Sequence, residues 1–484
     1  MNPEKAETSL FNEPYRLSIG GRLVRSDRTF GVINPATSKI FAQAPAATRA
    51  ELDDAVAAAG AAFPAWAALG EEKRQAYLNV FADELEKHRD EFVRLLTLEQ
   101  GKPLSTTATD EVNISIRWIR EIAARRVPVE VVEETNEHIA ELHHVPIGVV
   151  GAITPWNFPF QMAVIKIAPA LITGNTIVLK PSPLTPLCTL RMGEIAQAVF
   201  PAGVVNVLSS AADENDIAPH LTTHPGVAKI TFTGSTEVGK KVMQASAETV
   251  KRVTLELGGN DATIILPGTE WRAIVPKLFW AAFTNAGQWC AGLKRLYVHS
   301  SIKDEFVAVF VGYAKQQKVG SGLQPDIVIG PVQNRMQFEK VRSLLDDIKA
   351  NGQTIALGGE IGSGDDGYFV PVTVVDNPPN AARIVQEEQF SPILPIIAYD
   401  EVEQAIAWAN DNPYGLGGSV WGPDAGTAKA VAMRLETGTV WVNEIHTSTI
   451  DMPFGGHKMS GLGVEHGLEG RKLFTNPKII SIRK

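Results

Sequence analysis

The sequence predicts an α/β protein built on parallel, doubly wound sheets. Short runs of β-branched residues alternate with helical stretches over most of the chain, which is the pattern of such sheets. Hydrophobic residues make up 44% and charged residues 20% of the 484, so the chain can bury a large core. At about 150 residues per domain, this length accommodates two large domains or three smaller ones.

The first 120 residues predict a hairpin followed by helices. The hairpin covers 16–24 and turns at Gly20-Gly21, and a second turn is expected at Asn34-Pro35. Apolar residues with a helical period predict a helix over 49–68, a helix or helix pair over 71–99 that Gly101 ends, and another helix over 110–126.

Two alternating series follow. The first series predicts strands at 148–154, 176–180, 204–208, 229–233 and 253–257, with helices at 162–173, 187–200 and 236–248. The second series predicts strands at 262–266, 296–299, 354–357, 393–399, 419–421 and 439–442, with helices at 302–317, 334–350, 401–409 and 425–436. An extended strand is expected at 478–484.

Composition argues against several classes of protein. A net charge of −9 does not suit a nucleic-acid partner, and two cysteines cannot form a disulfide framework or a four-thiolate zinc site. The His143-His144 and His220/His224 pairs lack acidic or thiol partners at metal-ligand spacing in the sequence, so no metal is expected.

No targeting or membrane segment is expected. The first five residues lack the pattern of a signal peptide, and Lys166 and two prolines interrupt the most apolar window, 158–179. We therefore expect a cytoplasmic protein without a membrane partner.

Cys290 lies in a turn of small residues after an apolar helix at 274–284. Flanking glycines let a ligand approach this thiol, which makes Cys290 a candidate nucleophile. A buried structural cysteine fits the same position, and for Cys188, in a helical pattern, that is the preferred interpretation.

Two further polar residues follow predicted strands. Glu256 ends an apolar strand, where a raised pKa would suit a general base and a structural ion pair is the alternative. Asn157, between Trp156 and two prolines, could donate to an oxyanion or could be an ordinary turn residue.

Two other positions could hold phosphate or ribose. Residues 232–239 join a strand to a helix and contain small residues and hydroxyls. They could form a phosphate site, or Ser235 or Thr236 could simply cap the helix. Lys180 ends another strand, where it could bind ribose or phosphate or remain a solvated charge.

Taken together and in their order along the chain, these sequence motifs resemble those of the NAD(P)-dependent aldehyde dehydrogenase superfamily. The resemblance covers the chain from about residue 15 to its end, in the stretches 154–159, 180–182, 232–235, 256–259, 287–290, 387–392, 412–417 and 453–461.

The resemblance implies oxidation of an aldehyde to the carboxylic acid with NAD(P)+. Cys290 would form a thiohemiacetal and then a thioester, and Asn157 and the Cys290 N–H would hold the oxyanion. Glu256 would activate water for hydrolysis, and Lys166 matches a lysine that lies near both groups in the family.

The resemblance also implies the cofactor residues, namely Thr154, Trp156, Lys180, Gly234, Ser235, Gln337, Glu388 and Phe390. NAD is the expected cofactor, although Pro183 stands where many NAD-preferring members have Glu, which leaves NADP open. Ser391 replaces a commoner Gly.

For the whole molecule, the resemblance implies two Rossmann-like doubly wound domains and a small β flap for oligomerisation. We expect a cofactor-binding domain in 1–123 and 147–257, a catalytic domain in 258–469, and a flap of 124–146 and 470–484 that forms a homodimer or homotetramer.

The substrate is expected to be a small neutral aliphatic or aromatic aldehyde. Phe158, Trp289, Phe454, Thr284, His446 and Ser448 are expected to line its entry, without an arginine pair for a carboxylate. The alternatives are a semialdehyde dehydrogenase and a cofactor-independent cysteine esterase or thioesterase.

Overall fold

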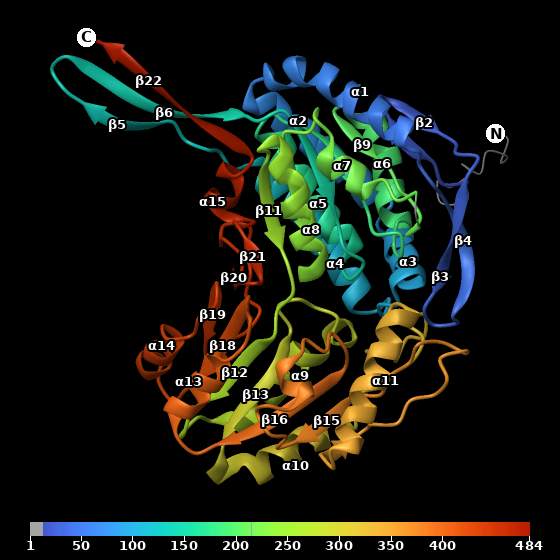
Figure 1. The fold of residues 1–484 in the computed structure, drawn as a ribbon, viewed down its shortest axis with the longest axis vertical. Coiled ribbons are helices and arrows are strands. Elements are labelled where there is room, and N and C mark those ends of the chain that lie inside the picture. Colours follow the sequence, from blue (N-terminus) through green and yellow to red (C-terminus); the bar gives the residue numbers. More distant parts are fainter. Residues whose placement is uncertain (1–12, 214) are drawn as a thin grey trace, which may run out of the picture.

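Two large sheets form the cores of two lobes, and a narrow three-stranded sheet projects from one of them (Figure 1). The computed structural model describes residues 13–213 and 215–484, so the first five residues, where no signal peptide is expected, lie outside its description. The described part contains no helix that is both long and apolar enough to cross a membrane.

The first sheet has eight strands in the order β2-β1-β9-β8-β7-β10-β11-β21. Strands β9, β8, β7, β10 and β11 are parallel to one another, and β1, β2 and β21 pair antiparallel at the two edges. The bounds are β1 Leu17–Ile19, β2 Arg22–Val24, β7 Val149–Ile153, β8 Thr176–Lys180, β9 Val205–Val207, β10 Lys229–Thr233, β11 Arg252–Glu256 and β21 Gly461–Leu462.

The order in which the chain adds strands to this sheet changes sides at β7, so that the switch point lies between β7 and β10. Strands β8 and β9 are added on one side of β7, whereas β10 and β11 are added on the other. A crevice forms beyond the carboxyl ends of the strands at such a switch point, and ligands bind there in open α/β sheets. The segments after β7 and β10, which begin at Thr154 and Gly234, both start at this crevice.

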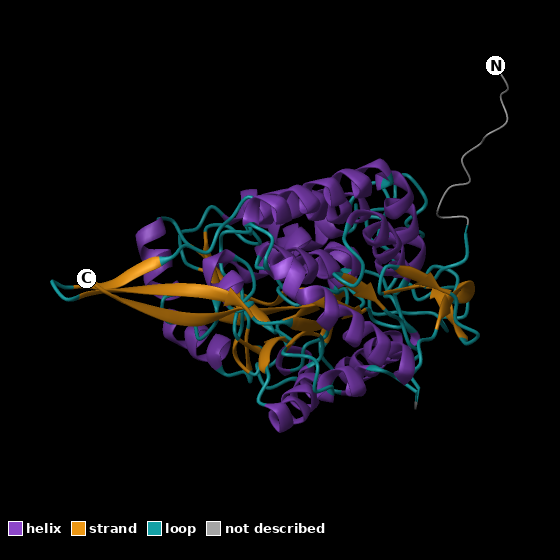
Figure 2. Ribbon diagram, turned by 90° about the horizontal axis from the view of Figure 1, so that it is seen from above, coloured by secondary structure: helices purple, strands orange, loops and turns teal. Residues whose placement is uncertain are grey.

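Helices cover the first sheet. Strands β7, β8 and β10 are buried along their whole length, because helices lie on both sides of the strand layer (Figure 2). The helices are α1 Arg49–Ala67, α2 Glu71–Lys87, α3 Arg89–Gln100, α4 Thr107–Ala123, α5 Pro159–Ile172, α6 Leu187–Val199, α7 Ala218–Thr223 and α8 Thr236–Ser246. A short hairpin, β3 Thr29–Asn34 with β4 Lys39–Pro45, lies beside them.

The second sheet has seven strands in the order β14-β15-β16-β13-β12-β18-β19. Only β14 is antiparallel to its neighbour. The strands are β12 Asp261–Ile265, β13 Leu293–His299, β14 Thr354–Leu357, β15 Thr373–Asp376, β16 Ile393–Tyr399, β18 Gly417–Trp421 and β19 Thr439–Val442. The helices of this lobe are α9 Val275–Phe283, α10 Lys303–Ala314, α11 Arg335–Ala350, α12 Arg383–Gln386, α13 Val402–Asn410 and α14 Ala425–Ala432. Helix α15, Gly467–Lys472, lies beside the first lobe instead (Figure 1).

A separate hydrophobic core lies on each face of the second sheet. Ile264 packs into one and Ile265 into the other, as the alternation of side chains along a strand requires. Each fully buried isoleucine contributes about 1.5–3 kcal/mol by leaving water. This double core fixes β12 and β13, and the loop between α9 and β13 is therefore held on a rigid base.

The projecting sheet consists of β5 Glu130–Glu134, β6 His138–Pro146 and β22 Thr475–Arg483, which ends at the tip near the C-terminus (Figures 1 and 2). β22 pairs antiparallel with β6 along its full length, from Thr475 opposite Pro146 to Arg483 opposite His138. Large apolar side chains remain exposed on this arm, among them Val131, Val132, Ile479 and Ile482.

The fold class predicted from the sequence is confirmed, and most differences concern element ends. The expected helix over 71–99 is a pair, because the chain leaves helical geometry at His88. Strand β15 was not predicted. Strand β13 begins at Leu293 rather than at 296. The sequence pattern placed its start too late because two consecutive charged residues, Lys294 and Arg295, are buried within the strand.

Candidate active site

Cys290 lies where two cavities meet between the two sheets. It lines both, together with Gln161, Met162, Thr233 and Trp289. The larger cavity, of about 320 Å³, is also lined by Pro155, Trp156, Asn157, Phe158, Gly234, Ser235, Leu257, Gly258, Met336, Gln337, Lys340, Glu388 and Phe390. The smaller, of about 100 Å³, is also lined by Trp118, Ile165, Glu256, Ala291, Trp441, His446, Ser448, Phe454, Glu465 and His466.

A strained turn carries Cys290 to this junction. Asn285 and Ala286 have positive φ angles of 55° and 54°, and Gly287 follows at 71°. A Cβ atom at Gly287 would lie 2.3 Å from the carbonyl oxygen of Ser391, so only glycine fits there. Such conformations cost about 1–3 kcal/mol at non-glycine residues and persist where surrounding contacts hold them.

Hydrogen bonds hold the strained turn in place. The side-chain nitrogen of Asn285 donates to the carbonyls of Asn157, at 2.9 Å, and Gln288, at 3.1 Å. The Gln288 side chain donates back to the carbonyl of Asn285 at 2.9 Å and accepts from the N–H of Gln333 at 2.8 Å. These buried amides connect the turn to the segment after β7.

The thiol of Cys290 is half-buried, and burial raises its pKa to about 12. Asp261, Glu256 and Glu388 act in the same direction, whereas Lys294 lowers the pKa. The thiol is therefore protonated at neutral pH, and a reaction at its sulfur requires removal of that proton.

Glu256 ends β11 in the smaller cavity. Neither carboxyl oxygen has a hydrogen-bond partner among the described residues, and burial raises the pKa well above its ordinary value. The nearby Glu465 raises it further and Lys166 lowers it. A carboxylate with a raised pKa is a stronger base once it has lost its proton, so this position can supply a general base.

Lys166 is fully buried on α5 and forms an ion pair with Glu465. Glu465 lines the smaller cavity, and its backbone exchanges two hydrogen bonds with Phe454, at 2.8 and 2.7 Å. Lys166 thus acts on the Glu256 environment through its charge rather than by lining either cavity.

Asn157 is held by contacts from both lobes. Its side-chain nitrogen donates to the carbonyl of Gln288 at 3.1 Å, and its own carbonyl accepts from Lys102 Nζ at 2.5 Å. Lys102 also forms a buried ion pair with Glu111, which accepts the first free N–H groups of α5 from Phe160, at 3.0 Å, and from the residue after it, at 3.1 Å. This network fixes the side-chain amide in the lining of the larger cavity.

Six of the eight residues predicted to bind cofactor line the larger cavity, namely Trp156, Gly234, Ser235, Gln337, Glu388 and Phe390. Thr154 and Lys180 do not line it. Thr154 is buried at the start of the segment after β7, and Lys180 lies buried at the end of β8 with its Nζ 3.2 Å from Asp216.

The lining of the larger cavity fits a dinucleotide. Ser235 caps α8, whose N-terminus offers N–H groups and a positive dipole to phosphate. Thr233 presents a buried hydroxyl without a hydrogen-bond partner among the described residues. At Gly258 a Cβ atom would lie 2.7 Å from the Glu388 carboxylate, so glycine leaves that group open toward the cavity.

A model of the aldehyde dehydrogenase family matches residues 23–480. The chain belongs to this family. Aldehyde dehydrogenase LUC3 of Fusarium sp. is 38% identical over 467 residues, 96% of this chain and 98% of the relative. Phenylacetaldehyde dehydrogenase of Pseudomonas fluorescens is 36% identical over 483 residues, 97% of this chain and 96% of the relative.

A solved aldehyde dehydrogenase structure confirms the fold. The betaine aldehyde dehydrogenase of Staphylococcus aureus, in complex with NAD+, has a TM-score of 0.91 and 34% sequence identity, with 96% of this chain and 94% of that chain covered. The resemblance predicted from the motifs is thus correct, and the protein is an aldehyde dehydrogenase.

Four of the six residues expected at the substrate entry of this aldehyde dehydrogenase line the smaller cavity, namely Trp289, Phe454, His446 and Ser448. Phe158 lines the larger cavity instead, and the Thr284 hydroxyl donates to the carbonyl of Trp280 at 2.6 Å, as expected of a hydroxyl in a helical turn.

Sequence reasoning missed four buried ionisable residues around the site: Lys102, Glu111, Lys294 and Glu465. A charged pair inside an apolar strand, Lys294-Arg295, is a signal that could have identified one of them. Glu465 pairs with Lys166, 299 residues away, and Lys102 and Glu111, which pair with each other, also bind the distant segment 157–161, so spacing in the sequence gives no indication of these contacts.

One expectation about histidines needs correction. His220 and His224 do have an acidic partner, because Asp53 on α1 reaches their Nε2 atoms at 2.7 and 3.3 Å. The N–H of Gly226 donates to Nδ1 of His224 at 3.0 Å, which leaves the ring proton on Nε2 for Asp53. The contacts of His224 are therefore satisfied within the protein.

Proposed function

We propose that this aldehyde dehydrogenase oxidises a neutral aliphatic or aromatic aldehyde to the carboxylic acid, with NAD+ in the larger cavity and the aldehyde in the smaller. One observation carries the proposal: the Cys290 thiol lines both cavities, so that a single sulfur can face substrate and cofactor. Bound NAD+ supplies the two-electron oxidant.

Cys290 acts as the nucleophile. The Glu256 carboxylate, whose charge acts on Cys290, accepts the thiol proton. The thiolate then adds to the carbonyl carbon to form a thiohemiacetal, and the side-chain amide of Asn157 and the Cys290 N–H hold the oxyanion. The rigid attachment of Asn157 to Lys102 and Gln288 supports that role, because an oxyanion donor must be fixed in advance. Oxidation of the adduct leaves a thioester on the sulfur.

Glu256 acts as the general base for hydrolysis of the thioester. Its carboxylate takes a proton from water, the resulting hydroxide adds to the acyl carbon, and the C–S bond breaks to release the carboxylic acid and the thiol. The unbonded carboxyl oxygens and the raised pKa support this role. Lys166 and its partner Glu465 tune the charge beside Glu256.

NAD+ is held by residues of both lobes. We assign its pyrophosphate to Gly234 and Ser235, its adenine ribose to Lys180, and its nicotinamide end to Gln337, Glu388 and Phe390, with Thr154 and Trp156 along the segment after β7. The Asp216 carboxylate beside Lys180 supports NAD+ over NADP+, because it would repel a 2′-phosphate.

The smaller cavity suits a neutral aldehyde. Aromatic rings in its lining come from Trp118, Trp289, Trp441 and Phe454, and neither Arg nor Lys is among the lining residues. Two histidines line it. The His446 ring packs against Trp289 with ring centroids 4.0 Å apart, and burial lowers its pKa to about 4, so it is neutral at physiological pH. Burial also lowers the pKa of His466. A semialdehyde that carries a carboxylate would find no cation there.

We also propose the larger-scale assignments. Residues 1–123 and 147–257 form the cofactor-binding domain, residues 258–469 the catalytic domain, and residues 124–146 and 470–484 the flap of a homodimer or homotetramer. The exposed apolar side chains of the arm support the flap's role, and two free cysteines among the described residues agree with a cytoplasmic location.

A spectrophotometric assay tests the function. Purified protein is given phenylacetaldehyde, a straight-chain aldehyde, betaine aldehyde or succinic semialdehyde, each with NAD+ or NADP+, and the absorbance of reduced nicotinamide is followed. We expect the highest kcat/KM with a neutral aldehyde and NAD+. A higher value with succinic semialdehyde would contradict the substrate assignment, and ester hydrolysis without any aldehyde oxidation would favour the cysteine esterase.

A further inference from the structure

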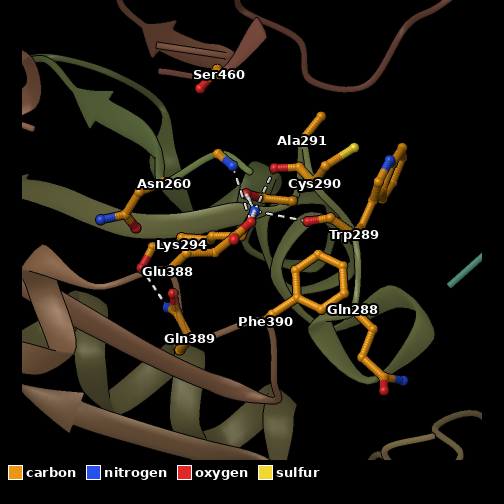
Figure 3. Close-up of polar contacts among 12 residues, drawn as sticks. Asn260, Gln288, Trp289, Cys290, Ala291, Lys294, Glu388, Gln389, Phe390 and Ser460 are labelled. Carbon is orange, nitrogen blue, oxygen red and sulfur yellow. Dashed lines mark hydrogen bonds and ion pairs between the residues drawn. The ribbon is translucent and has the colours of Figure 1, made fainter. Parts of the chain in front are cut away.

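Lys294 is a buried lysine whose ammonium points into the loop that carries Cys290. It lies in β13 with a side chain only 3% exposed. Its Nζ donates to the carbonyl of Trp289 at 2.7 Å, of Cys290 at 2.5 Å and of Gly292 at 3.2 Å (Figure 3). An ammonium has three N–H donors and no acceptor, so all three donors are used by one loop.

This contact sets the direction of the Cys290 backbone. The carbonyl of Cys290 turns toward Lys294, and the sulfur points away from it (Figure 3). A Cβ atom at Gly259 would lie 2.7 Å from that carbonyl oxygen, so glycine is needed where β11 leads into β12 for the loop to sit this close. The ammonium therefore fixes the loop on the side of the Cys290 carbonyl, away from the sulfur.

Lys294 also balances the charges around the nucleophile. The ionisable groups that face Cys290 come from four elements: Glu256 at the end of β11, Asp261 in β12, Lys294 in β13 and Glu388 after α12. Lys294 is the cation of this set, and its Nζ is 3.9 Å from the Glu388 carboxylate. The three carboxylates raise the pKa of the Cys290 thiol and Lys294 lowers it.

We propose that Lys294 is a positioning residue for Cys290: it binds three loop carbonyls and so directs the sulfur toward the substrate, and its positive charge favours the thiolate over the thiol. The proposal rests on the proposed role of Cys290 as the nucleophile. A lysine that merely stabilises the start of β13 would leave the reactivity of the thiol unchanged in variants that remain folded.

Alkylation of Cys290 by iodoacetamide tests this without aldehyde or cofactor. The thiolate displaces iodide as the S–C bond forms, and below the thiol pKa the rate follows the thiolate fraction. We expect Lys294→Met to lower the second-order rate constant about tenfold at every pH from 7 to 10, the equivalent of one pKa unit. Lys294→Arg, which keeps the charge, should restore most of that rate.

Controls separate this effect from a loss of folding. Lys294→Gln, which keeps a polar group, covers the case in which the Met variant fails to fold, and thermal unfolding is recorded for each variant. Lys303→Met removes a lysine that pairs with Asp376 in the same lobe, 3.0 Å away, and should react like the native protein. Cys290→Ala identifies the alkylated site.

Two results would overturn different statements. A folded Lys294→Gln or Lys294→Met variant with the native alkylation rate at each pH would overturn the role of Lys294. Undiminished aldehyde oxidation by Cys290→Ala would instead overturn the proposed nucleophile, whatever the alkylation data show. In steady-state assays, the Lys294 variants should lose kcat more than they change KM.

Discussion

The side-chain nitrogen of Asn157 lies 3.1 Å from the carbonyl oxygen of Gln288. Asn157 follows β7 of the first sheet, whereas Gln288 belongs to the loop that leads into β13 of the second, so this hydrogen bond crosses between the lobes. It joins the proposed oxyanion donor to the loop of the proposed nucleophile. The position of the Asn157 amide relative to the Cys290 sulfur thus depends on the contact between the two lobes.

Replacement of this amide should affect chemistry more than binding. We expect Asn157→Ala to lower kcat by about 10²–10³-fold with a small change in KM, because loss of one oxyanion donor has an effect of that size. Steady-state kinetics with the best aldehyde measure it. A variant that keeps native kcat would show that Asn157 has no part in holding the oxyanion.

The carboxylate beside Lys180 should control cofactor choice. Asp216→Asn removes the negative charge 3.2 Å from Lys180, which then becomes available to a 2′-phosphate. We expect kcat/KM for NADP+ to rise about tenfold, a change of about 1.4 kcal/mol.

Asp213→Asn is the matched control, because Asp213 lies near the surface and its closest cation is Arg28 at 3.8 Å. Both variants are assayed with NAD+ and NADP+. If Asp216→Asn leaves the ratio of the two kcat/KM values unchanged, the carboxylate does not discriminate between the cofactors.

His446 should make the protein lose stability in mild acid. Burial lowers its folded-state pKa from 6.5 to about 4, so the unfolded chain takes up the proton first as the pH falls. The stability that the neutral ring contributes is present above pH 6.5 and is lost as the pH falls toward 4. Between pH 7 and pH 5 we expect a loss of about 2 kcal/mol from this group.

Urea unfolding of the native protein and of His446→Asn at the two pH values measures this loss. The asparagine variant cannot titrate, and its free energy of unfolding should fall by about 2 kcal/mol less. His138→Asn, on the arm, is the control. Equal losses in the native protein and in His446→Asn would contradict the buried, neutral state of the ring.

Much of the fold follows from the sequence because buried parallel strands leave a clear pattern. Apart from one terminal lysine in each, the runs at Thr176–Lys180 and Lys229–Thr233 are continuous apolar or β-branched stretches, and the strands have those bounds. Strand β15, Thr373–Asp376, was missed, although β14 and β19, which are also four residues long, were predicted.

The site was harder to predict in its supporting contacts than in its reacting groups. Cys290 and Glu256 belong to motifs, whereas the hydrogen bonds of Lys294 go to backbone carbonyls, which any residue offers. The sequence therefore gives no partner for its charge. Lys166 and Glu465 are 299 residues apart, and their pairing depends on how the last part of the chain packs against α5.

Intact-protein mass spectrometry of Glu256→Gln, mixed with the best aldehyde and NAD+, tests the central claim most directly. The account predicts that acyl-enzyme accumulates, with the added mass of the aldehyde less two hydrogens, and that peptide mapping locates it on Cys290. An unmodified Cys290 in a variant that still reduces NAD+ would contradict the account.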